Sequence, residues 1–555
     1  MKSRPAIIHL VKLRVGRWTA LALFISALEA HLWAAPTVAS VANAASNIPF
    51  QSGIAQGSIF VIKGSGLGPA SISFAPTPFQ STSLSGTSIR VTVGATSVDA
   101  PLYYTSANQV AALLPSNTPT GAGTFSVTYN GQASNALGQT ITANNIGVFT
   151  IDSSGQGPAI VSYPDYSLVS AVKAPNCGGP GTPCGAAHPG ETLMLWGTGL
   201  GPVSGNETGG DGLGQAMAAV PLTLWVGGIQ AQILYQGRSG CCVGLDQIAF
   251  VVPAAVPTGC AVPLVLQIGA TAPAISNSSV LPVASGSRNC TPNNAAAGLE
   301  ASQIPATGAL AIGDIDLEKV MSTGGGLQDE AYFAFVSFTF KAGMQPFFQS
   351  FADQLPAGVC VVYSSLTPNE NIPIDSFSVL DGGSKVTLKG PAGSATVPGP
   401  SFNLASFNAG GTFLAPGAYT VTGTGGAAVG PFSATITIPP PPTLTSPLSA
   451  TNVSRSAGMT VNWKDGDPNG NVLVSLRSAV DSARTTGATA RCKVPASAGT
   501  FTIPPYVLLA LPAGSFTDFV FGTAESETPF TAPGISGGSL HTQSAVSEFT
   551  GFPLN

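Results

Sequence analysis

Short apolar runs separated by polar turns recur along the whole chain of 555 residues. The runs are rich in β-branched and aromatic residues and are bounded by Gly, Pro, Asn and Ser, which is typical of β-strands. In the first half they predict two consecutive sets of strands, at residues 58–63, 88–93, 101–105, 109–114 and 124–129, then at 192–196, 222–226, 232–235, 247–252 and 262–268. No helical period persists over about 12 residues in either set. The pattern therefore predicts an all-β fold.

The second half of the chain continues the same pattern with fewer repeats. Strands are expected at residues 332–340, 359–363, 385–389, 418–423 and 431–438, and a short helix at 347–354. After a run of four prolines at 439–442, residues 459–463 and 472–476 are expected to form a hairpin. Two further strands are expected at 499–503 and 507–511.

An internal repeat covers the first half. The segment Gly57–Pro69 recurs as Gly190–Pro202, and the segment Asn108–Gly121 recurs as Asp246–Gly259. The additional residues of the second copy lie between the two segments, around Cys241-Cys242. Two segments in constant order with a local insertion indicate a duplicated domain of about 130 residues, a size that suits a β-sandwich. The turn motif of the repeat consists of Gly64, Gly66, Gly68, Pro69 and their counterparts Gly197, Gly199, Gly201 and Pro202.

These motifs resemble a known domain type. The Gly-Ser-Gly-Leu-Gly-Pro turn after a strand, the Val93-Gly94 and Val226-Gly227 turns and the Gln-Val/Ile…Pro segments resemble IPT/TIG-type immunoglobulin-like domains. With the opening Asn43-Ala-Ala-Ser46, the pair is similar to an exported protein family of acidobacteria of the Solibacter type. The resemblance covers about residues 36–292. It implies tandem immunoglobulin-like β-sandwich domains and export, and it brings no catalytic residues.

The N-terminal segment is predicted to be a signal peptide. Five basic residues precede an uncharged apolar stretch at 18–28. That order is typical of secretory signals, and the stretch is too short to span a bilayer. An uncleaved anchor is the alternative. The predicted organisation is a signal peptide at 1–35, sandwich repeats at 36–152 and 153–292, a third sandwich module at 300–438, a Pro-rich linker at 439–445 and a fourth sandwich module at 446–555.

The composition narrows the class of protein. Only 8% of the residues are charged, whereas soluble domains carry about 25%. A hydrophobic content of 44% excludes charge-driven disorder, and the scarcity of Lys and Arg argues against nucleic-acid binding. Removal of residues 1–35 would change the net charge from −5 to −9.

Eight cysteines follow the predicted signal: Cys177, Cys184, Cys241, Cys242, Cys260, Cys290, Cys360 and Cys492. An even number in an exported chain indicates disulfides. Spacing favours Cys177 with Cys184 and Cys260 with Cys290, and a bond from Cys360 to Cys492 would join two modules. Cys241 and Cys242 could bond each other or exchange partners with Cys260 and Cys290. Zinc is not expected, because Cys-x-x-Cys pairs are lacking and only two histidines follow residue 35.

Several catalytic motifs have a simpler interpretation. The Gly-x-Gly-x-Gly turn at Gly64 is followed by proline where a dinucleotide site needs a helix. Gly534–Gly538 fits Gly-x-Ser-x-Gly, but His541 follows Ser536 too closely for a nucleophile elbow. The acidic loop 465–471 lacks the glutamate of a calcium loop, because Leu476 stands at position twelve, and is interpreted as a hairpin turn.

Acidic pairs and tryptophans remain as candidates. Asp314 and Asp316 would share one face of a strand, and Asp329 and Glu330 form a second pair. Both pairs are interpreted as solvated. The tryptophans at 196, 225 and 463 are interpreted as core residues. No catalytic, cofactor-binding or metal-binding residue is therefore predicted.

The resulting functional hypothesis is a non-enzymatic exported protein, secreted or at the cell surface, with a structural or interaction role. The expected partner is a protein or a glycan, without nucleic acid and without a transmembrane segment after the signal peptide. The alternative is a secreted carbohydrate-active enzyme or accessory protein with any active site in residues 300–555.

Overall fold

A computed structural model describes residues 35–48, 53–76, 81–270, 273–292, 299, 304–305, 309–321, 327–340, 354–366, 374–399, 401–408, 411–449 and 452–555. The predicted signal peptide lies outside the described residues except for Ala35, as does the helix expected at 347–354 except for its last residue. A search of the described residues for a helix of sufficient length and hydropathy to cross a bilayer found none.

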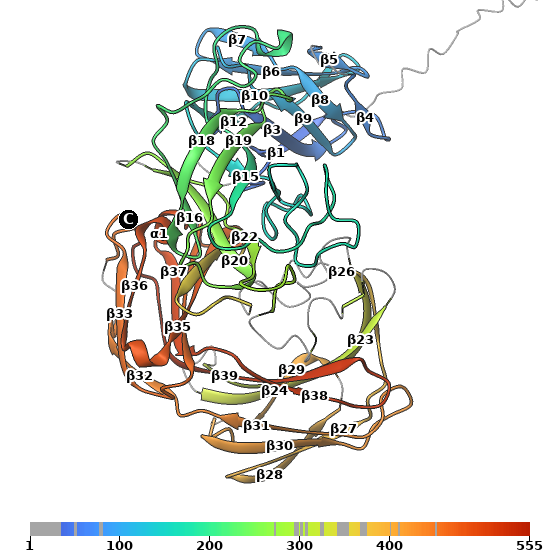
Figure 1. Cartoon of the computed structure of the whole chain (residues 1–555), viewed down its shortest axis with the longest axis vertical. Helices are drawn as coiled ribbons and strands as arrows, with labels where there is room; N and C mark the ends of the chain where they lie inside the picture. The colour runs from blue at the N-terminus through green and yellow to red at the C-terminus, as the bar shows by residue number, and fades with distance from the viewer. Residues whose placement is uncertain are drawn as a thin grey trace, which may run out of the picture. The chain divides into compact units, whose positions relative to one another are not determined.

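The described chain is almost entirely β-structure (Figure 1), which confirms the predicted all-β class. Its one α-helix among these residues is α1, Pro505–Leu509. Apolar side chains alternate with polar ones where a strand covers a core on one face. In β31, Phe432–Ile438, every second residue is buried and the residues between them are exposed.

The first repeat is a two-sheet sandwich. One sheet has the order β1 (Thr37–Asn43), β3 (Ile59–Ser65), β9 (Gln109–Leu113), β8 (Leu102–Thr105) and β4 (Ser73–Phe74). The other has the order β2 (Ile54–Ala55), β12 (Leu137–Thr142), β10 (Gly121–Tyr129), β6 (Thr87–Val93) and β5 (Ser83–Leu84), with β7 (Thr96–Asp99) and β11 (Gln132–Ala133) on its edges. The two sheets enclose one core of apolar side chains, including Phe60 and Phe125.

The second repeat has the same two-sheet plan. One sheet contains β13 (Gly147–Val148), β15 (Thr192–Thr198), β19 (Asp246–Val251) and β18 (Gln232–Arg238), with β14 (Val161–Ser162) beside β15. The other contains β17 (Ile229–Gln230), β16 (Leu222–Val226), β20 (Gly259–Ile268), β21 (Ala274–Ile275) and β22 (Ser279–Val283). A short 3-10 helix, η1 (Glu207–Gly209), follows the turn motif.

The turn motif occupies equivalent places in the two repeats. Gly66 and Gly199 adopt φ angles of 64° and 113°, in the left-handed region that favours glycine. A Cβ atom on Gly199 would lie 2.1 Å from the carbonyl oxygen of Asn145. The motif is therefore a tight turn, as the following proline indicated.

The remaining strands form three sheets. A ten-stranded sheet runs β25 (Val359–Tyr363), β35 (Gly487–Pro495), β34 (Asn471–Ala479), β37 (Phe516–Thr523), β39 (Gly537–Thr550), β23 (Leu310–Met321), β24 (Leu327–Phe340) and β26 (Ile374–Val379), with β29 (Ser401–Asn408) on β24 and β38 (Ser526–Phe530) on β39. A four-stranded sheet contains β28 (Gly393–Pro398), β27 (Lys385–Gly390), β30 (Gly417–Gly423) and β31. A three-stranded sheet contains β32 (Pro442–Ser446), β33 (Met459–Asp465) and β36 (Thr500–Ile503).

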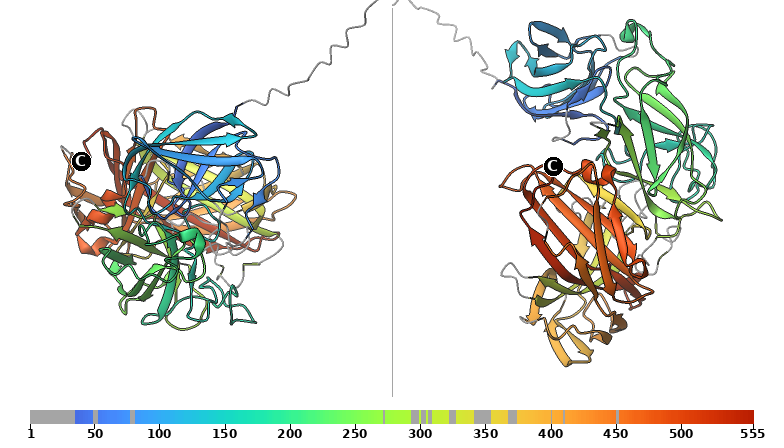
Figure 2. Two further views of the ribbon diagram at one scale, coloured as in Figure 1. Left: turned by 90° about the horizontal axis from the view of Figure 1, so that it is seen from above. Right: turned by 90° about the vertical axis from the view of Figure 1, so that its left-hand side faces the viewer.

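The ten-stranded sheet takes strands from both sides of the four prolines (Figures 1 and 2). β23 pairs in parallel with β39, and β25 pairs antiparallel with β35. The four-stranded sheet packs on one end of the long sheet, around Phe335 and Tyr419. The three-stranded sheet and α1 pack on the other end, around Trp463 and Phe521. Residues 300–438 and 446–555 thus share one sheet.

Two local predictions are wrong. Residues 459–463 and 472–476 do not form a hairpin, because β33 pairs with β32 and β36, whereas β34 pairs with β35 and β37. The loop 465–471 therefore connects two sheets. Residues 507–511 are not a strand. Pro504 and Pro505 open α1 there, since proline fits the first turn of a helix, where its missing N–H is not needed.

Candidate functional site

The second repeat carries a hollow on the outer face of β15 and β19. Its volume is about 810 Å³, within the range of roughly 300–1,000 Å³ that is typical of small-molecule sites. The wall includes Phe149, Ile160, Tyr166, Trp196, Cys241 and Gln247, and no charged side chain is among its described lining residues. We refer to this hollow as the Trp196 pocket.

Two aromatic rings give the Trp196 pocket its character. Trp196 faces outward because its neighbour Leu195 enters the core of the sandwich. The indole Nε1 of Trp196 donates a hydrogen bond to Ser162 Oγ at 3.0 Å, which fixes the ring. The ring of Tyr166 lies 6.3 Å from that of Trp196, at an angle of 33°, and 51% of Tyr166 is exposed. The interpretation of Trp196 as a core residue is therefore wrong.

Two disulfides lie in the loops around the Trp196 pocket. The bond Cys177–Cys184 closes the loop that brings Pro180 to the wall. The bond Cys241–Cys242 joins neighbours in the loop that contributes Ser239, Gly240, Cys241 and Leu245 to the wall. A closed loop loses fewer conformations when a ligand binds, so the Cys177–Cys184 loop is preorganised.

The first repeat differs from the second on the face that corresponds to the Trp196 pocket. Lys63 pairs with Gln109 across β3 and β9, and at the equivalent register Trp196 pairs with Gln247 across β15 and β19. The loop between β8 and β9 comprises only residues 106–108, whereas the loop between β18 and β19 comprises 239–245 and contains both adjacent cysteines. The tryptophan and the inserted loop are therefore features of the second copy, whereas the same face of the first copy has its own hollow, lined by Lys63, Gln109 and Tyr104.

The remaining disulfides are Cys260–Cys290 and Cys360–Cys492, so all eight cysteines are paired. The prediction of disulfides is confirmed. Of the two arrangements left open for Cys241 and Cys242, the structure shows a bond between the two neighbours.

A buried ion pair lies where the two repeats meet. Arg238 Nη1 donates to Asp246 Oδ1 at 2.7 Å, and Asp246 Oδ2 accepts the backbone N–H groups of Gly199 and Leu200 at 2.7 Å each. Glu207 lies 3.6 Å from Arg238 and accepts the backbone N–H of Ser116 in the first repeat. Burial raises the pKa of Asp246 to about 6, although Arg238 opposes the shift. This cluster holds the turn motif and is structural.

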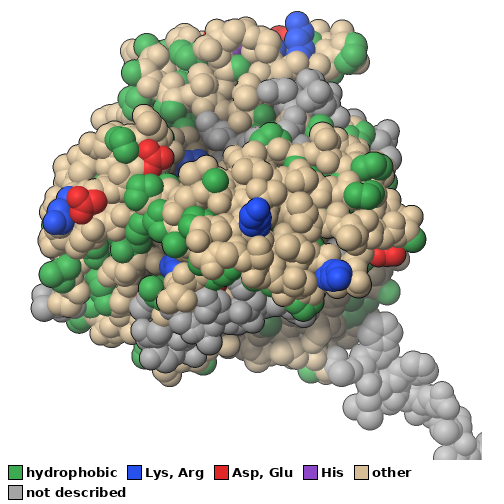
Figure 3. Space-filling view, turned by 90° about the horizontal axis from the view of Figure 1, so that it is seen from below, with side chains coloured by type: hydrophobic (Ala, Val, Ile, Leu, Met, Phe, Trp, Pro, Cys, Tyr) green, Lys and Arg blue, Asp and Glu red, His purple; other side chains and the backbone are tan. Residues whose placement is uncertain are grey.

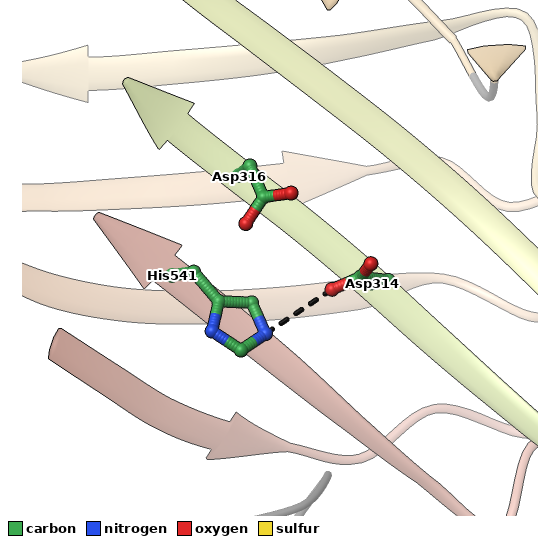
Figure 4. A group of neighbouring side chains, drawn as sticks. All are labelled: Asp314, Asp316 and His541. Carbon is green, nitrogen blue, oxygen red and sulfur yellow. Dashed lines mark ion pairs between the residues drawn. The ribbon is translucent and has the colours of Figure 1, made fainter. Parts of the chain in front are cut away.

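A second charged cluster lies on the ten-stranded sheet (Figure 4). Asp314 and Asp316 project from one face of β23, as their spacing predicted, and His541 lies beside them on β39. His541 Nε2 lies 3.1 Å from Asp314 Oδ1, and its Nδ1 forms an ion pair with Glu525. His541 is only 4% exposed. Asp314 and Asp316, which were interpreted as solvated positions on a half-buried sheet, are both half-buried, and they lie next to this histidine.

The charged side chains in this cluster shift one another's pKa values. Burial opposes a charge on His541, but the carboxylates of Glu525 and Asp314 outweigh it and raise the pKa of His541 well above its usual value. Burial and the charge of Asp314 raise the pKa of Asp316 well above its usual value. Burial would raise the pKa of Glu525 as well, yet the charge of His541 lowers it. These shifts favour a charged imidazole between the carboxylates of Asp314 and Glu525, and the neutral form of Asp316.

The other candidates stay structural. Asp329 is fully buried, forms an ion pair with Lys319 at 3.2 Å and accepts the backbone N–H of Phe413, so it is not a solvated position either. Trp225 stacks on Tyr506 with ring centres 4.8 Å apart, and Trp463 is buried, as expected for core residues. Ser536 precedes β39 and lies outside the charged cluster.

Charge is sparse elsewhere too. On the face drawn in Figure 3, charged side chains are few and scattered among uncharged atoms. Against this background, Asp314, Asp316, Glu525 and His541 form a second group of ionisable side chains besides the Arg238 cluster. Sequence analysis missed the two last members because they are more than 200 positions away from β23.

No protein-family model matches the chain, and a search of curated proteins gave no match. Solved structures with a similar arrangement include immunoglobulin domains 1–4 of Sidekick-1, at 12% identity over 93% of this chain and 99% of that chain, with a TM-score of 0.12. SGBP-B from a xyloglucan utilization locus of Bacteroides uniformis aligns at 10% identity over 90% and 99%, with a TM-score of 0.15. Domains 5–6 of the S-layer protein SbsC align at 10% over 45% and 100%, with a TM-score of 0.17.

With TM-scores this low, none of these neighbours carries an argument about this chain. The sheets themselves make it an all-β protein whose two repeats are consecutive β-sandwich domains, as predicted from its strands and its repeat. The similarity does not extend to an IPT/TIG or acidobacterial family.

Proposed function

We propose that this protein is exported and acts outside the cell as a non-enzymatic binding protein, with the Trp196 pocket as its ligand site. The pocket has a small-molecule volume and uncharged walls, one wall loop is closed by Cys177–Cys184, and another contains the adjacent pair Cys241–Cys242. Four disulfides are typical of an oxidising extracellular compartment, which agrees with the predicted signal peptide at 1–35. In this proposal the first two domains, 36–152 and 153–292, are an IPT/TIG-like pair, and residues 300–555 complete the chain around the shared ten-stranded sheet.

One observation carries the proposal. At the same register of the same sheet, the first repeat has Lys63 and a short loop, whereas the second has Trp196 and the Cys241-Cys242 insertion. A sandwich needs neither feature for its core, since Trp196 faces away from it. Loops held on a rigid scaffold are common sites of recognition.

The chemistry of the wall favours an uncharged glycan as the ligand. Aromatic rings bind the apolar C–H faces of a sugar, and the amide of Gln247 and the hydroxyl of Tyr166 can hydrogen-bond to sugar hydroxyls. A charged ligand would lose its hydration in this pocket without gaining a partner of opposite charge.

A glycan array followed by titration calorimetry with the full chain tests the proposal. We expect Trp196→Ala to weaken binding at least about tenfold, the loss expected for a central aromatic contact. Phe377→Ala is the matched control, because Phe377 is 59% exposed on β26 and outside the pocket. Retention of full affinity by the Trp196 variant would place the ligand elsewhere, and the absence of any bound glycan would refute this ligand class.

One observation favours the alternative of a carbohydrate-active enzyme. The range 300–555 does bring carboxyl groups together, at Asp314, Asp316 and Glu525. Release of reducing ends from polysaccharides by the full chain, and its loss in Asp316→Asn, would support that alternative.

A further inference from the structure

We propose that Asp314, Asp316 and His541 bind a divalent transition-metal cation such as Zn²⁺. This site is independent of the Trp196 pocket and of the function proposed for it. The sequence spacing predicted that Asp314 and Asp316 share one face of a strand. It could not predict that His541 lies beside them, because β23 and β39 are far apart along the chain.

The geometry brings three ligands, two carboxylates and one imidazole, to one point (Figure 4). The parallel pairing of β23 with β39 sets Asp316 opposite His541 and Asp314 opposite Ser539. One ligand atom from each of the three side chains lies within 4.8 Å of the others. Ligands about 2.0–2.2 Å from a zinc ion stand at such mutual distances after a small inward adjustment.

Glu525 is placed to orient the histidine. It contacts Nδ1 of His541, while Nε2 faces Asp314. Histidines that bind metals almost always donate their other ring N–H to a carboxylate or carbonyl, which fixes the tautomer and makes the ligating nitrogen more basic. A buried histidine between one orienting carboxylate and two further carboxyl groups has this arrangement.

Charge favours a cation at the same point. The carboxyl groups of Asp314, Asp316 and Glu525 surround one imidazole. Two further neighbours, Glu318 and Tyr332, carry no positive charge. Lys493 and Arg491 interact electrostatically with Glu525.

The donor set selects the type of metal. One imidazole nitrogen with two carboxylates suits zinc, manganese or iron(II) and leaves positions for water. Calcium prefers six to eight oxygen ligands, which these three residues do not supply. We therefore expect zinc to bind much more tightly than calcium or magnesium.

Titration calorimetry with ZnCl₂ on the chelator-treated full chain tests the site. We expect one ion per chain, a rise in the thermal midpoint with zinc, and binding at least about tenfold weaker in Asp316→Asn. Glu525→Gln should weaken binding by roughly 10- to 100-fold without removing a ligand, as is typical of second-layer partners. Asp467→Asn and His188→Gln are matched controls, because they remove an acid and a histidine far from the cluster in sequence and fold, and should leave the affinity unchanged.

A measurement on the unmodified chain tests the site even if the variants misfold. X-ray absorption of the zinc-loaded chain should show nitrogen and oxygen ligands with the scattering of one imidazole. Failure of the chain to bind zinc, equal affinity in the cluster variants and the controls, or a spectrum without imidazole would each overturn the site. None of these results bears on glycan binding by the Trp196 variant.

Discussion

Arg238 is the largest fully buried side chain among the described residues, in a protein with few charges. It is held by Asp246, whose carboxylate also binds the turn of the second repeat through Gly199 and Leu200. In the first repeat the corresponding turn is held by the backbone carbonyls of Ala107 and Asn108 instead. A change from an amide to a carboxylate at this position thus made the turn of the second copy dependent on a buried cation.

The first prediction concerns the protonation of Asp246. Its pKa is raised to about 6 in the folded chain, whereas an unfolded aspartate titrates near pH ~3.9. Between these values the unfolded chain loses the proton first, so the unfolding free energy should fall as the pH rises from about 4 to about 6. A difference of about two between the folded and unfolded pKa values corresponds to a loss on the order of 3 kcal/mol.

Urea unfolding at several pH values, in the chain and in Asp246→Asn, measures this effect. The variant lacks the titrating group, so its stability should fall less over the same pH interval. Other carboxyl groups contribute equally to both proteins and cancel in the comparison. Parallel pH profiles would show that Asp246 keeps an ordinary pKa.

At the scale of elements, the Cys360–Cys492 bond joins β25 to β35 at directly opposed positions. Its partners are 132 residues apart in the chain. A cross-link across so long a loop removes many conformations of the unfolded chain. In the chain-entropy account this raises the free energy of unfolding by about 5 kcal/mol. Cys177–Cys184 spans only 7 residues and should contribute about half as much.

The second prediction compares these two bonds. Replacing Cys360 and Cys492 together by alanine should lower the unfolding free energy about twice as much as the same change at Cys177 and Cys184. Guanidinium unfolding of both double variants measures the difference. A smaller loss at the long loop would mean that the paired strands already restrict the unfolded chain.

The local pattern of apolar and polar residues predicted most strands correctly, but it did not predict which strands pair with each other. The spacing of Asp314 and Asp316 placed them on one face, because a strand has a period of two. The pattern could not bring His541 to them, since the pairing of β23 with β39 is parallel and its long connection leaves no turn signal. Trp196 was misplaced for another reason: residues 193–196 are all apolar, and a continuous apolar run does not show which face is buried.

At the scale of the whole molecule, the repeats and the remainder of the chain are built differently. The sheets of residues 36–292 contain no described strand from beyond β22. The ten-stranded sheet, in contrast, places β39 between β37 and β23, so the last strand of the chain joins both ends of that sheet. Contacts such as the stack of Trp225 on Tyr506 then connect the second repeat to this sheet.

The third prediction follows from the position of β39. A chain that ends at residue 530 loses the strand that pairs with β23 on one side and with β37 on the other. Both cores that flank the ten-stranded sheet should then unfold together, because each includes side chains from strands that β39 joins. The sandwiches at 36–292 should keep their fold, since their own sheets stay complete.

Limited proteolysis with mass spectrometry distinguishes the outcomes. The full chain should resist cleavage throughout its sheets, and the shortened chain should leave a resistant fragment of about residues 36–292. The same reasoning predicts that residues 300–438 do not fold alone, whereas 300–555 do, because β23 has β39 as its second partner and β25 pairs with β35. A resistant fragment from 300–438 would instead establish a module that is stable without the shared sheet, and β39 would then be an accessory strand rather than the one that completes the fold.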